Sequence, residues 1–142
     1  MINQDPKALR KVYFEAWQKE LKGEDTSPLE AMIVDIIKRH PEYQPIFTHP
    51  ESFENLQDEK IPLDHNPFFH LGLHVTILEQ LGADKPTGIR TIYAQLLKKH
   101  GDQTLTEHKM MECLAKALVF SFQKGNETQS EHFYLESLKR LL

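Results

Sequence analysis

Apolar residues recur every three to four positions along most of this chain, which is the period of an amphipathic α-helix. Several of these stretches begin with a capping side chain followed by a proline, as at Asp5-Pro6, Ser27-Pro28 and Asn66-Pro67. The alternating stretches and tight turns of β-hairpins do not recur. The pattern therefore predicts an all-α fold, a single-domain helical bundle of about five or six helices.

The periodic stretches define six expected helices. They run from Pro6 to Gly23, from Ser27 to His40, from Asn66 to Gly82, from Thr87 to Lys99, from Thr104 to Gln123 and from Ser130 to Leu142. Between the second and third helices, prolines interrupt the periodicity of residues 41–65, although 52–56 suits a short helical turn. We therefore expect one domain over residues 1–142, with 41–65 as a long proline-containing connection.

The composition narrows the class of protein. The chain has 142 residues, of which 39% are hydrophobic and 27% charged, as in an ordinary soluble globular protein. No apolar run approaches the roughly 18 residues of a transmembrane helix, and the first residues lack the apolar core of a secretory signal. Cys113 is the only cysteine, which excludes an intramolecular disulfide and a CxxC motif. We predict a cytoplasmic protein.

The charge pattern and the missing motifs exclude several functions. The net charge is -4, and lysine and arginine are spread thinly, so neither nucleic acid nor a membrane is an expected partner. The glycine-rich motifs of nucleotide-binding loops and the GxSxG motif of serine hydrolases are absent from the sequence. No nucleotide or organic cofactor is therefore indicated.

Two pairs of polar residues fall on the apolar faces of expected helices. At 100° per residue, His70 and His74 lie about 40° apart inside the apolar arc of the third helix. On the fifth helix, His108 and Glu112 share one edge of the expected buried face, whereas Cys113 points away from it. Glu107 lies on the other edge and is interpreted as the carboxylate of a capping box.

If the third and fifth helices pack face to face, these two pairs converge. We interpret His70, His74 and His108 as nitrogen ligands of one divalent metal ion, with Glu112 as an oxygen ligand or as a group that orients a ligand. Three imidazoles and a carboxylate suit zinc, iron or manganese. A structural hydrogen-bond network and a metal-free acid-base site stay open as alternatives.

Two further histidines are weaker candidates for ligands. His40 ends the second helix and is expected to cap its carbonyl groups, with a ligand role as the lesser alternative. His65, just before the third helix, is a candidate loop ligand. His49, His100 and His132 are expected at the surface.

Two functional classes follow from the helical pattern and the histidines. In the first, a metal-bound water is activated for hydrolysis, but no residue identifies a substrate, so enzyme activity stays open. In the second, the chain is a metal-free protein-interaction module in which the histidine-glutamate network only stabilises the core. Its protein partner and its oligomeric state are not indicated by the sequence.

Four stretches also resemble a known family. They are SPLEAMIVDIIKRHPEY, NPFFHLGLHVTILEQ, GIRTIYAQLLKKHGD and EHKMMECL, which together cover nearly the whole chain. With these motifs the sequence resembles a bacterial domain-of-unknown-function family, number 1841, of small proteobacterial proteins. Where related sequences tend to carry tryptophan in the fifth helix, this chain reads LVFSF, which keeps an aromatic residue at Phe120. The resemblance implies no activity.

Overall fold

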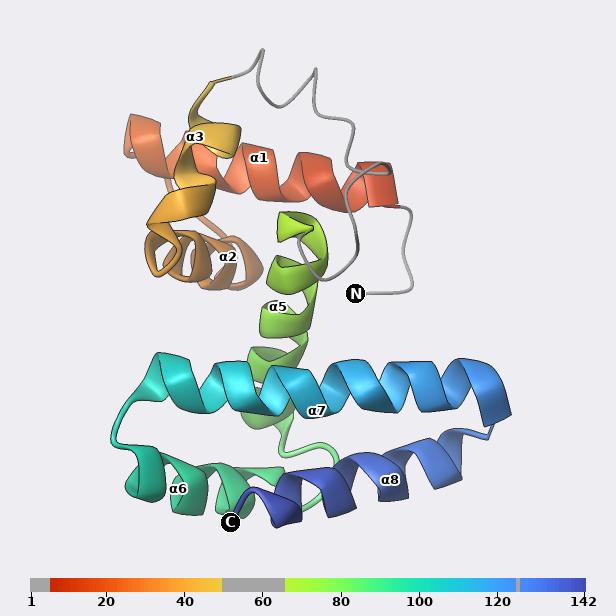
Figure 1. Cartoon of the computed structure of the whole chain (residues 1–142). Coiled ribbons are helices and arrows are strands. Elements are labelled where there is room, and N and C mark those ends of the chain that lie inside the picture. The colour runs from red at the N-terminus through yellow and green to blue at the C-terminus, as the bar shows by residue number, and fades with distance from the viewer. Residues whose placement is uncertain (1–5, 50–65, 125) are drawn as a thin grey trace. The chain divides into compact units, whose positions relative to one another are not determined.

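The computed structural model of the chain describes residues 6–49, 66–124 and 126–142, and these residues form helices and their connections (Figure 1). The all-α prediction is confirmed, because the described ranges contain no β-strand. They contain seven α-helices and one short 3-10 helix, so the expected number of five or six was too low. The helices are α1 (Pro6–Lys22), α2 (Pro28–Lys38), η1 (Pro41–Tyr43), α3 (Gln44–Thr48), α5 (Pro67–Ala83), α6 (Ile89–His100), α7 (Gln103–Lys124) and α8 (Glu127–Arg140).

The additional helix comes from the segment expected to be a long connection. Pro41 and Pro45 stand in the first turns of η1 and α3, where a proline initiates a helix because the missing N–H has no partner there in any case. The prolines had been interpreted only as breaks in the pattern. The remainder of that connection, including the turn expected at 52–56 and His65, lies outside the described residues.

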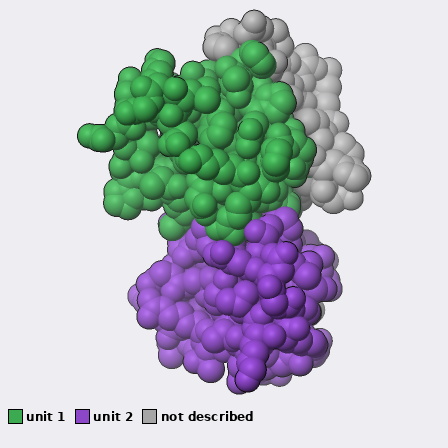
Figure 2. All heavy atoms as spheres, turned by 90° about the vertical axis from the view of Figure 1, so that its left-hand side faces the viewer, with its two compact units in different colours: residues 1–75 green, residues 76–142 purple. Residues whose placement is uncertain are grey.

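The helices are grouped into two compact units, which meet in sequence between Val75 and Thr76 (Figure 2). The first unit contains α1, α2, η1, α3 and the N-terminal turns of α5, and the second contains the rest of α5 with α6, α7 and α8. The boundary lies inside α5, so this one helix contributes residues to both units. A single domain over residues 1–142 stays a prediction.

The core of the first unit is aromatic and aliphatic. Tyr13 and Trp17 on α1 are buried, and Trp17 donates a hydrogen bond from its indole N–H to the Thr48 hydroxyl at 3.1 Å. The ring of Phe68 on α5 lies 5.7 Å from that of Phe47 on α3. The core also contains Ala16, Ile33, Val34, Ile36, Ile37 and Leu71. These contacts join α1 to α3 and α3 to the first turn of α5.

The second unit is built on α7 and α8, which form an antiparallel pair with α6 beside them (Figure 1). Its buried apolar side chains include Ile77, Ile89, Ile92, Leu96, Met110, Leu114, Ala117 and Leu138. Tyr134 on α8 is also buried, and its hydroxyl donates a 2.6 Å hydrogen bond to the side-chain oxygen of Gln80 on α5. Gln80 thus fixes the C-terminal turns of α5 to α8.

Local capping explains most of the helix boundaries. The capping box at Ser27 and Glu30 is confirmed, since each side chain accepts a hydrogen bond from the backbone N–H of the other residue. Asn66 caps α5 by accepting from the Phe68 N–H at 2.9 Å. Two expected starts were wrong: α7 is capped by Asp102 rather than Thr104, and α8 by Asn126, so α8 begins before Ser130.

Candidate metal site

His40 lies just beyond the last turn of α2, on the same side as the buried isoleucines of that helix. Its side chain is only 2% exposed, and its Nδ1 lies 2.7 Å from the carbonyl oxygen of Ile36. Because a carbonyl oxygen can only accept, Nδ1 carries the proton and the neutral ring presents the lone pair of Nε2. The expected capping role is therefore met by one nitrogen, and the other nitrogen is a potential metal ligand.

His70 and His74 lie one turn apart on α5. His74 is completely buried and His70 is half-buried, in agreement with their expected place within the apolar arc of this helix. The preceding cap at Asn66 fixes the first turn of α5 and thereby the direction in which His70 leaves the helix. The buried residues Leu71 and Val75 fill the positions beside them.

The three imidazoles of the first unit converge. The Nε2 atoms of His40 and His70 are 2.9 Å apart, and the ring of His74 lies 5.4 Å from that of His40 and 6.3 Å from that of His70. One ring nitrogen from each of the three lies within 4.8 Å of those of the others. His40 thus joins the pair that the sequence predicted, although it had been ranked as a weaker candidate.

The protonation of His40 favours metal binding. Burial lowers the pKa of His40, and although the Ile36 carbonyl acts in the opposite direction, the nearby His74 lowers the pKa further. A lowered pKa keeps the ring neutral near pH 7, and the neutral imidazole is the form that binds a metal ion. His40 therefore has the neutral charge and the tautomer that a metal-binding histidine requires.

The spacing of the nitrogens allows two chemical interpretations. Two nitrogens bound at about 2.0–2.1 Å to one ion are about 2.9 Å apart at a right angle and about 3.4 Å apart at the tetrahedral angle. The 2.9 Å between the Nε2 atoms of His40 and His70 lies at the short end of this range. Without an ion, the same distance is a hydrogen bond in which the His70 N–H donates to His40.

Tyr43, at the end of η1, packs against two members of this cluster. Its ring stacks on His40 with 5.4 Å between the ring centroids and an angle of 5° between the planes. It also meets His70 at 5.8 Å and 70°. Burial, assisted by the charge of Glu42, raises the pKa of Tyr43, so its phenol stays protonated at neutral pH. In the sequence, Tyr43 falls in the proline-containing connection, and the helical pattern predicts no role for it.

The residues predicted on α7 differ in their burial. His108 is half-buried, and its assignment as a ligand stays a prediction. Glu112 is exposed, so the expectation that it shares a buried edge with His108 was wrong. The wheel assumed one buried face along the whole helix, but Val119 and Phe122, which continue that face, are 54% and 87% exposed. The interior face of α7 changes along its length.

The assumption of one buried face along α7 also led to wrong predictions for the burial of Cys113 and the role of Glu107. Cys113, expected to point away from the interior, is 5% exposed on the side of the helix near Tyr134 of α8, and burial raises the pKa of its thiol. Glu107 is completely buried, and it accepts a 3.3 Å hydrogen bond from the Tyr93 hydroxyl rather than forming a capping box. The sequence signal for this burial was the pair Met110 and Met111, which lie three and four positions later, on the same face of a helix, and are both buried.

Comparison with known proteins gives a family but no described activity. The family model described as a domain of unknown function (DUF1841) matches residues 5–140. No curated protein and no solved structure matches the chain. In the part of the chain that the structure describes, no helix has both the length and the apolar character needed to cross a membrane.

Proposed function

We propose that this chain, which belongs to the DUF1841 family, binds one divalent transition metal ion through His40, His70 and His74. The observation that carries the proposal is the convergence of three imidazole nitrogens within 4.8 Å in a nearly buried position. His108 is proposed as a fourth ligand on the sequence pattern alone. We further propose a cytoplasmic protein, as the sequence predicts.

The chemistry of the donor set supports zinc, iron or manganese. Neutral imidazole is the commonest protein ligand for such ions, whereas calcium and magnesium require oxygen ligands. The hydrogen bond from His40 Nδ1 to the Ile36 carbonyl is the kind of outer contact that orients a metal-binding histidine. Three histidines alone would leave a fourth coordination position for water, which a bound zinc ion would activate near neutral pH, whereas His108 as a fourth ligand would take that position.

The test is elemental analysis of the full chain, purified without an affinity tag and reconstituted separately with zinc, iron(II) and manganese. We expect one equivalent of metal in the wild type and a large loss in His70→Ala and in His74→Asn. Because His74 is completely buried, its variant must be checked for helical content by circular dichroism. His70 is half-buried, so its variant reports on binding with less disturbance of the core.

A matched control is His49→Ala, which removes an exposed imidazole from the same unit. It should bind as much metal as the wild type. His108→Ala tests the fourth ligand: reduced metal affinity would support that assignment, and unchanged affinity would leave His40, His70 and His74 as the ligand set. If the wild type takes up no metal after reconstitution, the proposal is wrong.

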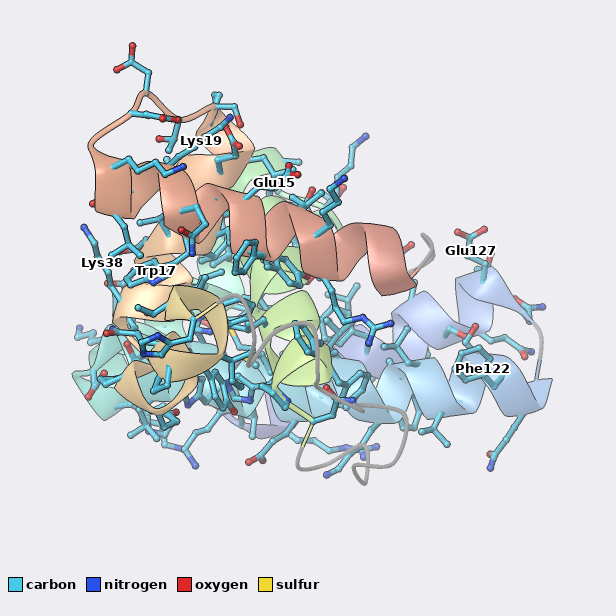
Figure 3. The ribbon with its side chains drawn as sticks, turned by 90° about the horizontal axis from the view of Figure 1, so that it is seen from above. Glu15, Trp17, Lys19, Lys38, Phe122 and Glu127 are labelled. Atoms are coloured by element: carbon cyan, nitrogen blue, oxygen red, sulfur yellow. The ribbon has the colours of Figure 1, made fainter. Side chains whose placement is uncertain are left out.

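The alternative function is a metal-free protein-interaction module, and α7 offers one observation in its favour. Phe122, labelled in Figure 3 near the C-terminal end of α7, is 87% exposed, and Val119 is 54% exposed on the same face. Beside α7 and α8 lies a groove of about 750 Å³ lined partly by Phe120 and Phe133, whose rings stack at 4.7 Å. Absence of metal in the reconstituted wild type would favour this function.

A further inference from the structure

His40 and Tyr43 are held together by a single 3-10 turn. The backbone N–H of Tyr43 donates to the His40 carbonyl at 2.9 Å, and Pro41 occupies the first turn. In a 3-10 helix there are three residues per turn, so side chains at positions i and i+3 eclipse each other. This geometry accounts for the nearly parallel stack of the two rings, with 5° between their planes.

Burial in the first unit is uneven around the histidines. His74 and His40 are 0% and 2% exposed, whereas His70 and Tyr43 are half-buried. The ring of Tyr43 touches the two imidazoles whose Nε2 atoms face each other, by stacking on His40 and by an edge contact with His70. The histidine cluster of the first unit is therefore open to solvent on the side of Tyr43 and His70.

We propose that Tyr43 is a positioning residue that covers the His40–His70 pair and slows the exchange of a bound metal ion. This inference rests on the proposed function, because it requires that an ion bind there. The aromatic ring, rather than the hydroxyl, makes the two contacts with the imidazoles. Tyr43→Phe should therefore keep the slow exchange of the metal ion. A side chain without an aromatic ring at this position should not keep it.

The experiment measures the rate at which the zinc-loaded full chain loses its ion to an excess of a chromophoric chelator. We expect Tyr43→Ala to release zinc at least about tenfold faster than the wild type, the scale on which outer contacts affect metal ligands. Tyr43→Phe should release it at the wild-type rate. Tyr43→Leu keeps apolar volume but lacks the ring, and it should resemble Tyr43→Ala.

The control is Phe120→Ala, which removes a half-buried, stacked ring from the second unit and should leave the release rate unchanged. The inference is overturned if Tyr43→Ala and Tyr43→Leu both release zinc at the wild-type rate, or if Tyr43→Phe is as fast as they are. The zinc content of the wild type reports separately on the proposed function. Tyr43→Leu also decides the matter if the alanine variant does not fold.

Discussion

The two units bury polar side chains in different ways. In the second unit, two tyrosine hydroxyls donate to side-chain oxygens, Tyr134 to Gln80 at 2.6 Å and Tyr93 to Glu107 at 3.3 Å. In the first unit, two ring nitrogens of the same kind face each other, the Nε2 atoms of His40 and His70. The tyrosine pairs of the second unit have a fixed donor and acceptor. The His40–His70 pair of the first unit depends instead on where the protons or a metal ion are placed.

This difference separates a structural contact from a candidate ligand site. A neutral imidazole has one donor and one acceptor, and His40 uses its donor on the Ile36 carbonyl. The lone pair on its Nε2 can then either accept a hydrogen bond from the His70 N–H or coordinate a metal ion. A tyrosine hydroxyl beside an amide or carboxylate oxygen offers no such choice. We therefore predict that metal removal lowers the stability of the chain through the first unit. Removal of a tyrosine hydroxyl should lower its stability through the second unit.

The largest expected effect is the loss of stability on chelation. An ion that binds only the folded chain adds about 2.7 kcal/mol at a free concentration one hundred times its dissociation constant. Removing metal with a chelator should therefore lower the melting temperature of the reconstituted wild type. The same treatment should leave His70→Ala unchanged, because that variant has lost a ligand. Differential scanning calorimetry measures both, and equal shifts in the two proteins would contradict the proposed ligand set.

The helix pattern and the caps of α2 and α5 were predictable from the sequence because they depend on neighbouring residues, whereas the caps of α7 and α8 were assigned to the wrong residues. Ser27 and Asn66 cap α2 and α5 through hydrogen bonds within three positions. The short helix α3 was missed because Pro41 and Pro45 initiate helices as readily as they interrupt them. Whether a proline starts or stops a helix depends on packing, here of Phe47 into the core.

The candidate site was predictable only in part. His70 and His74 were found because both lie on one turn of an apolar face, which is a property of a single helix. His40 was ranked low because its approach to His70 joins positions thirty residues apart, and helical periodicity contains no information about such contacts. The expected burial of Glu112 was wrong because a long helix such as α7 turns different faces to its neighbours along its length.

A smaller effect is expected from Tyr134→Phe in the second unit. The substitution removes the hydroxyl that donates to Gln80 and should cost about 1 kcal/mol of stability. Burial raises the pKa of Tyr134 well above its ordinary value, so the hydroxyl stays a donor throughout the physiological pH range. Urea unfolding measures the change, and a double-variant cycle with Gln80→Leu isolates the pair. The metal content should not change.

The smallest effect is expected from Glu112→Ala. The sequence pattern placed this carboxylate among the ligands, but its side chain is exposed on α7. Exposed substitutions away from special contacts usually change stability by less than about 0.5 kcal/mol. We therefore expect Glu112→Ala to keep both the unfolding midpoint and the metal content of the wild type, in contrast to His70→Ala. A loss of metal in Glu112→Ala would instead restore the carboxylate to the ligand set.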